Sequence, residues 1–173
     1  MPIEFRSVSV DDGMDFYEML QEIPAEENGF LNPVHGKSAA EYRQWLARCE
    51  ASAAATGLQD GWKVPQTTYW LCVDGRPAGI GRIRHFLTDK LREEGGHTGY
   101  AVRPDARHHG YGTLLLGELA AEAGNLGIHR MLLTIRKDNV YSLKAALANH
   151  GVIERQTDVR YFVWVDCRPA SGS

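Results

Sequence analysis

The chain has 173 residues, of which 43% are hydrophobic and 24% are charged, and its formal net charge is −3. This length suits one globular domain with a core of its own and is too short for two comfortable ones. The negative charge excludes a global basic field that would attract nucleic acid or an anionic membrane, and no apolar stretch is long enough to span a bilayer.

The beginning of the chain predicts a strand, a helix and a loop. Residues 3–10 alternate loosely between apolar and polar side chains, which indicates an opening strand. Asp11 and Asp12 are then expected to cap a helix that ends near Ile23, just before a proline. Segment 25–37 contains glycines, asparagines and a proline, so we expect a loop there.

A second helix is predicted to begin after Ser38. Ser38 is a suitable N-cap, and Glu41 three residues later completes a capping box. The helix places four side chains on one face: Tyr42, Trp45, Leu46 and Cys49. The aromatic residues Trp45, Trp62, Tyr69 and Trp70 are interpreted as core rather than as a cage for a substrate.

From Gln66 onward, strands and helices alternate. The Asp74-Gly75 pair is a strong hairpin signal between two β-rich segments. In chain order we expect strands at 67–73 and 78–86, a charged connection at 87–96, a strand at 97–102, a helix at 110–126, a strand at 130–136, a helix at 139–149, and a hairpin of 152–154 with 159–165. This order predicts an α/β or α+β domain over 1–167, followed by a flexible tail at 168–173.

The cellular location is predicted from the N-terminus and the cysteines. Residues 1–4 have neither the basic nor the apolar region of a signal peptide. Cys49, Cys72 and Cys167 are odd in number and widely spaced, which argues against a disulfide framework, a zinc site or a redox pair. We therefore expect a cytoplasmic protein that needs no metal.

The most informative segment is 99–113, GYAVRPDARHHGYGT. A strand ends at Val102, and Pro104 prevents it from simply continuing. A loop then leads into a helix, and it gathers basic and glycine residues: Arg107, His108, His109, Gly110 and Gly112. The first N–H groups of a helix lack helical partners, and together with the helix dipole they attract anions. The pattern predicts a site for a diphosphate or similar anion; the alternative is that the glycines only shape a tight strand-to-helix turn.

Two common nucleotide-binding motifs are excluded. The phosphate loop of nucleotide triphosphatases needs lysine after its last glycine, but Gly112 is followed by Thr113. The dinucleotide fingerprint needs a third glycine where this chain has Leu115.

The segment resembles the signature of a known family. The pattern Arg107-x-x-Gly110-x-Gly112 is similar to the R/Q-x-x-G-x-G/A signature of the GNAT superfamily of acetyltransferases. The likeness extends over roughly 66–165, through LLT at 132–134, DNVYS at 138–142 and GGHTGY at 95–100, and points to a bacterial branch of predicted acetyltransferases. The first 60 residues match weakly.

This resemblance implies a fold, a reaction and a binding site. The fold would be a twisted, mostly antiparallel sheet of about six or seven strands with about four helices, split between two central strands. The reaction would be direct transfer of an acetyl group from acetyl-CoA to an amine of a small molecule or peptide, with no covalent acyl-enzyme. Acetyl-CoA would be held by Tyr100, Ala101, Val102, Arg107, His108, His109, Gly110, Tyr111, Gly112, Thr113, Asn139 and Ser142.

Individual roles within this site follow from the same resemblance. The backbone N–H near Val102 would polarise the thioester carbonyl, and Asn139 would contact the pantetheine arm, although a plain N-cap is its alternative role. Many relatives place a tyrosine seven residues after that asparagine, as the general acid for the departing CoA thiolate, where this chain has Ala146. Tyr141, Ser142 or water are the candidates to replace it, and the proton donor stays unassigned.

The proton acceptor for the amine is the other open assignment. His97 and His85 are the best-placed candidates because histidine titrates near working pH; the alternative is that both are structural. Glu26 and Glu27 could instead meet a cationic acceptor. Two other functions stay open, an acetyl-CoA sensor without turnover and an enzyme for another acyl-CoA. The sequence does not identify the acceptor. A homodimer is one alternative for the oligomeric state.

Overall fold

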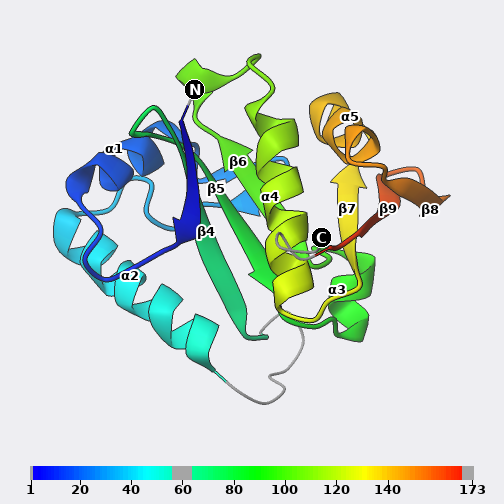
Figure 1. Ribbon diagram of the computed structural model, residues 1–173, viewed down its shortest axis with the longest axis horizontal. Helices are drawn as coiled ribbons and strands as arrows, with labels where there is room; N and C mark the ends of the chain where they lie inside the picture. Colours follow the sequence, from blue (N-terminus) through cyan, green and yellow to red (C-terminus); the bar gives the residue numbers. More distant parts are fainter. Residues whose placement is uncertain (1, 56–63, 169–173) are drawn as a thin grey trace.

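The computed structural model describes residues 2–55 and 64–168, which form two antiparallel sheets and a short hairpin (Figure 1). The larger sheet has the order β1-β4-β5-β6 and consists of β1 (Ile3–Ser7), β4 (Gln66–Val73), β5 (Arg76–Arg84) and β6 (Thr98–Val102). The smaller sheet has the order β7-β9-β8 and consists of β7 (Arg130–Arg136), β9 (Arg160–Asp166) and β8 (Val152–Gln156). The hairpin pairs β2 (Glu26–Glu27) with β3 (Phe30–Leu31).

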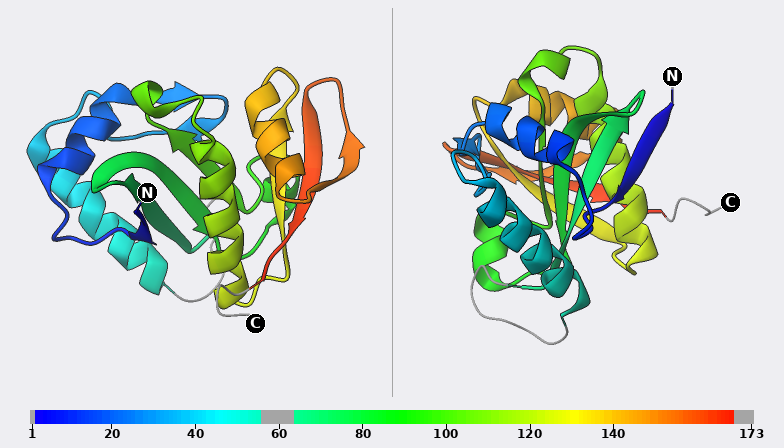
Figure 2. Two further views of the ribbon diagram at one scale, coloured as in Figure 1. Left: turned by 45° about the horizontal axis from the view of Figure 1, so that its top comes forward. Right: turned by 90° about the vertical axis from the view of Figure 1, so that its left-hand side faces the viewer.

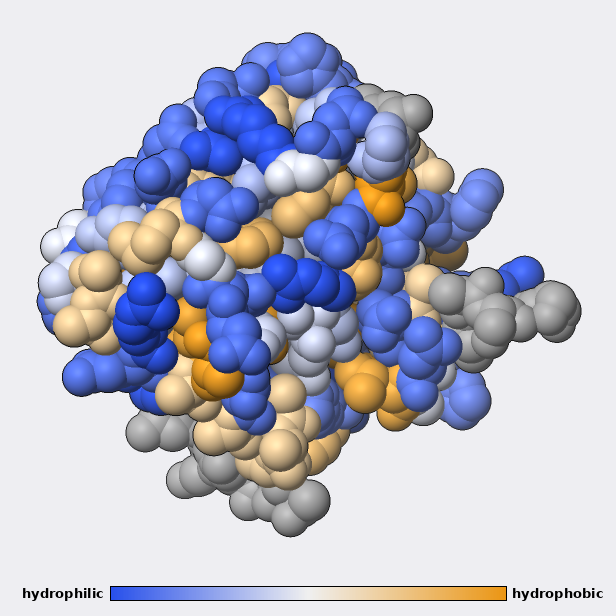
Figure 3. All heavy atoms as spheres, turned by 60° about the vertical axis from the view of Figure 1, so that its left-hand side comes forward, coloured by the Kyte–Doolittle hydropathy of each residue, from blue (hydrophilic) through white to orange (hydrophobic). Residues whose placement is uncertain are grey.

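Helices cover both faces of the larger sheet (Figures 1 and 2). The helices are α1 (Met14–Glu22), α2 (Ala39–Ala54), α3 (Asp89–Glu93), α4 (Tyr111–Asn125) and α5 (Val140–Ala148). Helices α1 and α2 pack against Trp70 and Ile80 on one face, whereas α4 packs against Leu71 and Ile83 on the other. Because both faces are covered, seven of the eight residues of β4 are buried. The face that carries α1 and α2 is mostly hydrophilic, with small separate apolar patches (Figure 3).

Local signals in the sequence account for several element boundaries. Ser38 and Glu41 form the expected capping box at the start of α2. Asp74 and Gly75 have φ of 52° and 77°, which are the left-handed values of a type I′ turn, and they join β4 to β5 as predicted. Gly127, with φ of 89°, follows the last turn of α4, and glycine readily adopts the left-handed conformation that ends a helix.

The start of α1 differs from the prediction. Its N-cap is Gly13, not Asp11 or Asp12, and β1 ends at Ser7. Asp12 is buried instead and accepts hydrogen bonds from the Trp70 Nε1–H at 2.8 Å and the Arg6 guanidinium at 2.7 Å. A fully buried tryptophan needs an acceptor for its N–H, so the core takes the carboxylate that the helix was expected to use.

The predicted loop at 25–37 contains the β2–β3 hairpin. Its turn is Asn28-Gly29, with φ of 53° and 89°, and this dipeptide is itself a hairpin signal that the loop interpretation overlooked. Phe30 of the hairpin is buried against the larger sheet. The charged connection at 87–96 contains the short helix α3, and the described residues have five α-helices, close to the expected number.

Other expectations concern the core, the cysteines and the tail. Trp45, Tyr69 and Trp70 are buried core residues as predicted, whereas Trp62 and residues 169–173 of the tail lie outside the described residues. All three cysteines are free. Among the helices of the described ranges, none combines the length and apolar character that crossing a bilayer requires.

Candidate functional site

The two sheets meet at the start of β6. The His97 N–H donates to the Leu132 carbonyl at 2.8 Å, and the Leu132 N–H donates to His97 Nδ1 at 2.9 Å. A β-carbon on Gly96 would lie 2.3 Å from the Leu132 carbonyl oxygen, so only glycine permits this approach. Beyond the junction, β6 pairs with β5 and β7 pairs with β9, so the two central strands separate.

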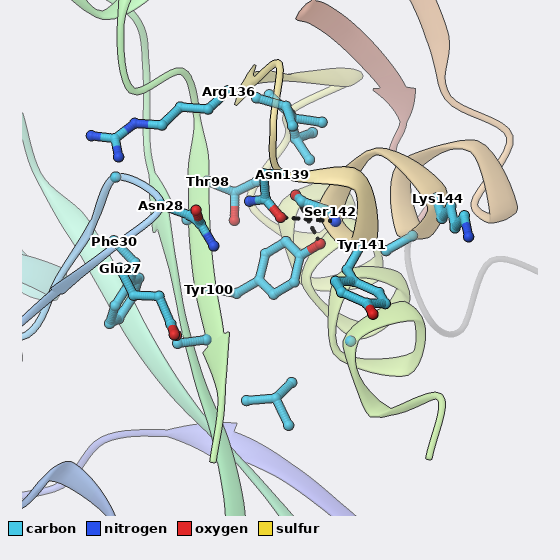
Figure 4. A pocket seen from close by; sticks show the side chains of 18 of the residues that line it. Glu27, Asn28, Phe30, Thr98, Tyr100, Arg136, Asn139, Tyr141, Ser142 and Lys144 are labelled. Atoms are coloured by element: carbon cyan, nitrogen blue, oxygen red, sulfur yellow. Dashed lines mark hydrogen bonds between the residues drawn. The ribbon is translucent and has the colours of Figure 1, made fainter. Parts of the chain in front are cut away.

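A cavity of about 560 Å³ lies between the separated strands (Figure 4). Its walls are β6, the 133–136 part of β7, the beginnings of α4 and α5, and the β2–β3 hairpin. This volume is within the usual range of ligand pockets. Among the described lining residues, the basic side chains are Arg82, Arg84, Arg107, Arg136, Lys144 and Arg160, and the acidic ones are Glu27 and Glu94. The cavity is therefore basic although the chain as a whole is acidic.

The backbone of β6 presents hydrogen-bonding groups to the cavity. The Arg103 N–H bonds to the Ala78 carbonyl, and the Arg84 N–H bonds to the His97 carbonyl. Backbone groups alternate in direction along an antiparallel strand, so those of Gly99 and Ala101 also point toward β5. The N–H groups of Tyr100 and Val102 consequently point away from β5, into the space between the sheets.

The loop before α4 has the local geometry of an anion site. Gly110 is the N-cap of α4 and adopts left-handed φ and ψ of 80° and 7°, and a β-carbon there would meet nothing within 4 Å. Its requirement is thus conformational, because other residues are strained at this φ. The first hydrogen bond of the helix runs from the Leu114 N–H to the Gly110 carbonyl, so the Gly112 and Thr113 N–H groups belong to the first turn, which has no helical acceptors.

Gly112 and Arg107 both line the cavity, and their protein contacts add to what the sequence predicts. A β-carbon on Gly112 would make ordinary contacts with Tyr100 and Val102 at 3.9 and 4.0 Å, so the fold itself leaves room for a small side chain. Arg107 donates to the Val102 carbonyl at 3.1 Å and pairs with Glu27 on β2. The arginine therefore ties the end of β6 to the hairpin, and Glu27 offsets its charge.

Tyr100 crosses the gap between β6 and α5 (Figure 4). Its hydroxyl lies 3.2 Å from Ser142 Oγ, and the Ser142 N–H donates to Asn139 Oδ1 at 3.3 Å. Burial raises the pKa of the Tyr100 phenol, and the hydrogen bond with Ser142 only partly opposes this. Asn139 is thus an N-cap of α5, and it also lines the cavity, so both roles considered for it are compatible with its position.

Tyr141 and Ala146 lie in contrasting environments on α5. Tyr141 is 68% exposed at the cavity rim, and its ring meets that of His108 edge-on at 5.5 Å. Ala146 is fully buried in the core, so the ring of a tyrosine has no room there. His109 packs against Tyr111 and is absent from the cavity lining, unlike the other residues expected to hold acetyl-CoA.

The two histidines expected to act as bases lie away from the cavity lining. His97 is buried at the junction, where its Nδ1 is the acceptor for Leu132, and burial and the charges of Arg92 and Arg84 lower its pKa to about 4. His85 lies 2.8 Å from Thr67 Oγ1, and burial lowers its pKa. Both geometries match the structural alternative.

Sequence reasoning missed most of the cavity outside the loop. The missed residues include Asn28, Phe30, Arg82, Arg84, Thr98, Thr134, Arg136, Lys144 and Arg160. They come from elements far apart in the chain, so no local motif joins them. One signal was present: Arg82 and Arg84 are two residues apart in an otherwise apolar strand, which places both on one face. Among the described residues, no group of acidic, histidine or cysteine side chains is arranged to hold a metal.

Comparison with known proteins identifies the family. The profile of the Acetyltransferase (GNAT) family matches residues 20–151. The chain belongs to this family. No curated protein matches the chain.

Solved structures share the fold of this GNAT acetyltransferase. A GNAT-family acetyltransferase from Streptococcus pneumoniae is 18% identical, with 96% of this chain and 99% of that chain covered and a TM-score of 0.64. PseH, an N-acetyltransferase from Campylobacter jejuni solved with acetyl coenzyme A, is 14% identical, with 95% and 99% covered and a TM-score of 0.63. YncA, a putative acetyltransferase from Salmonella typhimurium solved with acetyl-CoA, is 14% identical, with 99% and 98% covered and a TM-score of 0.65.

Proposed function

We propose that this GNAT acetyltransferase transfers the acetyl group of acetyl-CoA directly to an amine. The observation that carries the proposal is the cavity between β6 and β7. It has a turn with the geometry of an anion site at one end, and strand N–H groups that point away from β5 along one wall. Its volume, its basic lining and the left-handed Gly110 fit a long, phosphorylated co-substrate. PseH and YncA, which share the fold, were solved with acetyl-CoA.

The backbone performs the binding steps. The N–H groups at the start of α4, with the helix dipole, would hold the pyrophosphate, and Gly112 presents no side chain to this part of the cavity. Bound acetyl-CoA would supply the acetyl thioester. The outward N–H of Val102 would donate to the thioester carbonyl oxygen and stabilise the negative charge that develops as the amine attacks.

Tyr100 is the proposed proton donor to the thiolate that leaves when the carbon–sulfur bond breaks. Its hydroxyl lies inside the cavity, on the same strand as the Val102 N–H, and Ser142 fixes its direction. Because burial raises its pKa, the phenol stays protonated at neutral pH. Ser142 can pass a proton back to it, whereas Tyr141 is largely exposed and turned toward His108. The amine proton would leave through water, since neither His97 nor His85 lines the cavity.

Two measurements on the purified protein test the function. Calorimetry should show that acetyl-CoA binds, and a thiol-detecting assay should show release of CoA that depends on an added amine. Acetyl-CoA binding without CoA release from any of a broad set of amines would favour the sensor over the enzyme. Preference for a longer acyl-CoA in both measurements would reassign the donor.

A further inference from the structure

The end of the cavity opposite the turn before α4 contains two neighbouring arginines of β5, Arg82 and Arg84. On β5, Gly81 and Ile83 face α4: a β-carbon on Gly81 would touch Leu119, and Ile83 packs in the same core. Side chains alternate along a strand, so Arg82 and Arg84 face the other way. Arg82 accordingly lies over the Phe30 ring at 4.4 Å, beside the β2–β3 hairpin.

Both arginines line the cavity and donate only to neutral groups in the described residues. The Arg84 guanidinium donates to the carbonyls of Gly95 and Gly96, each at 3.1 Å. Arg82 donates to the Leu31 carbonyl at 2.5 Å. Within the parts of the chain that the structure describes, no carboxylate forms an ion pair with either side chain.

The other cavity arginines provide an internal comparison. Arg107 pairs with Glu27, Arg136 with Glu26 at 3.1 Å, and Arg160 with Glu94 at 3.1 Å. Figure 4 shows Arg136 extending away from Asn139 toward the side of the hairpin. The fold therefore supplies counter-charges for three cavity arginines and leaves the two on β5 with carbonyl and aromatic partners.

An unmatched charge in a partly buried place is costly unless something compensates it. Burial, followed by the charge of Arg84, lowers the pKa of Arg82 to about 10, and burial also lowers the pKa of Arg84. Guanidinium groups nevertheless stay charged at neutral pH. The two positive charges thus raise each other's energy, and an anion that enters the cavity lowers it.

We propose that the acceptor is an amine that also carries a carboxylate, and that Arg84, with Arg82 beside it, binds that carboxylate at the β5 wall of the cavity. This inference rests on the proposed transferase function. The planar guanidinium matches a carboxylate with two parallel hydrogen bonds, whereas the phosphates of the donor would be held by backbone N–H groups at the other end. Arg82 is paired in register with Gly99 on β6, next to the Tyr100–Val102 segment where the reaction would occur.

The register makes this arrangement compatible with a small acceptor. Gly99, the register partner of Arg82, lies one position before Tyr100 and three before Val102, which corresponds to about 3–10 Å along a strand. The Arg84 N–H bonds to the His97 carbonyl, two positions farther from these residues, and the long Arg84 side chain has to cover that extra distance. An amine and a carboxylate within one small molecule can therefore reach the thioester and the arginines together. Free amino acids and ω-amino acids are the class that this spacing admits.

The experiment compares acceptors that differ only in the carboxylate. Free amino acids, ω-amino acids, the corresponding amides and the decarboxylated amines are assayed for CoA release with wild type, Arg84→Gln, Arg84→Lys and Arg82→Gln. Arg155→Gln is the matched control, because Arg155 pairs with Glu93 at 3.1 Å and does not line the cavity. Binding of acetyl-CoA is measured by calorimetry for each variant.

The expected result is a preference for the acids that depends on Arg84. Acids should exceed their amides and amines in kcat/KM by roughly 10- to 100-fold, the usual worth of a hydrogen-bonded charge pair. Arg84→Gln should erase this preference by raising KM, Arg82→Gln should reduce it, Arg84→Lys should restore part of it, and Arg155→Gln should keep it. Equal use of amides and acids, or a preference that survives Arg84→Gln, would overturn the proposal. Turnover of phosphorylated amines alone would overturn the carboxylate assignment.

A binding readout separates this proposal from the transferase function. The melting temperature of each variant is measured with and without the same amino acids, in the absence of acetyl-CoA. Stabilisation of wild type but not of Arg84→Gln, with no CoA release from any amine, would retain the carboxylate site and reject the transferase function. Absence of both stabilisation and turnover would reject the carboxylate site as well.

Discussion

The two ends of the cavity are built in different ways. At the end near α4, residues of one short segment line the cavity, and the contacts proposed for the co-substrate come from backbone N–H groups beside the left-handed Gly110. At the end near β5, side chains from the β2–β3 hairpin, β5, β7 and β9 converge. A site made of backbone constrains conformation within one short segment, whereas a site made of side chains depends on how distant elements pack. The end near α4 is therefore less sensitive to changes in distant elements than the end near β5.

The largest effect is expected from a substitution at the end of the cavity near α4. Gly110→Val should weaken acetyl-CoA binding by at least about 10²-fold, because a β-branched residue is strained at φ of 80° and its branches approach the anion. Calorimetry measures the affinity. Gly127→Val is the matched control, since Gly127 has φ of 89° and equally open surroundings at the far end of α4. Equal affinity in Gly110→Val and wild type would place the pyrophosphate elsewhere.

The next effect concerns the wall between the two ends. Tyr100→Phe should lower kcat by about 10²-fold at unchanged acetyl-CoA affinity, because it removes the proposed proton donor and keeps the ring. Tyr141→Phe should change the rate little, since that hydroxyl sits on a largely exposed side chain. Single-turnover kinetics of both variants distinguish them. A large loss confined to Tyr141→Phe would move the role to the rim of the cavity.

A smaller effect, on stability, follows from Ala146. The family resemblance places a tyrosine at this position in many relatives, but Ala146 is fully buried among core residues. Ala146→Tyr should therefore lower the free energy of unfolding by about 1–3 kcal/mol, as overpacked cores do. Thermal unfolding should show a fall in melting temperature of several degrees. An unchanged melting temperature together with faster turnover would mean that α5 moves aside when acetyl-CoA binds.

These contrasts show what the sequence can predict. The strand and helix order after Gln66 and the loop of Gly110 follow from local patterns, because turns, caps and alternation are encoded within a few residues. The predicted start of α1 was wrong because the buried Trp70 N–H needs the carboxylate of Asp12 as its acceptor, and the two residues are 58 positions apart. The residues at the β5 end of the cavity were missed for the same reason, because they come from elements far apart in the chain.

The histidines illustrate how packing changes a chemical assignment. The position of His97 just before β6 predicts a base. Its Nδ1 instead accepts the Leu132 N–H at 2.9 Å, and this hydrogen bond joins the two sheets. At that position a neutral ring is required, because protonation of Nδ1 would set two donors against each other. The junction thus gives His97 a role in stability, and under the proposed function the amine would lose its proton without help from this ring.

The smallest kinetic effect is expected from His97→Asn. The amide oxygen of asparagine can accept the Leu132 N–H in place of Nδ1, and it does not titrate. The dependence of kcat/KM on pH above pH 6 should therefore keep its shape and come from the amine itself. If the pH profile of His97→Asn instead lost an inflection near pH 6.5, and its rate fell about 10²-fold at intact acetyl-CoA affinity, His97 would be the base and would act through a water chain.

The same variant should change how stability depends on pH. The pKa of His97 falls from 6.5 to about 4 on folding, so the unfolded chain binds a proton more readily between these values. The contribution of the neutral ring to the free energy of unfolding is complete above pH 6.5 and is lost as the pH falls through 4. This contribution is on the order of 3 kcal/mol. Denaturant unfolding of wild type should show this loss, and His97→Asn should show a shallower one. Identical slopes in the two proteins would mean that protonation of His97 does not open the junction between the sheets.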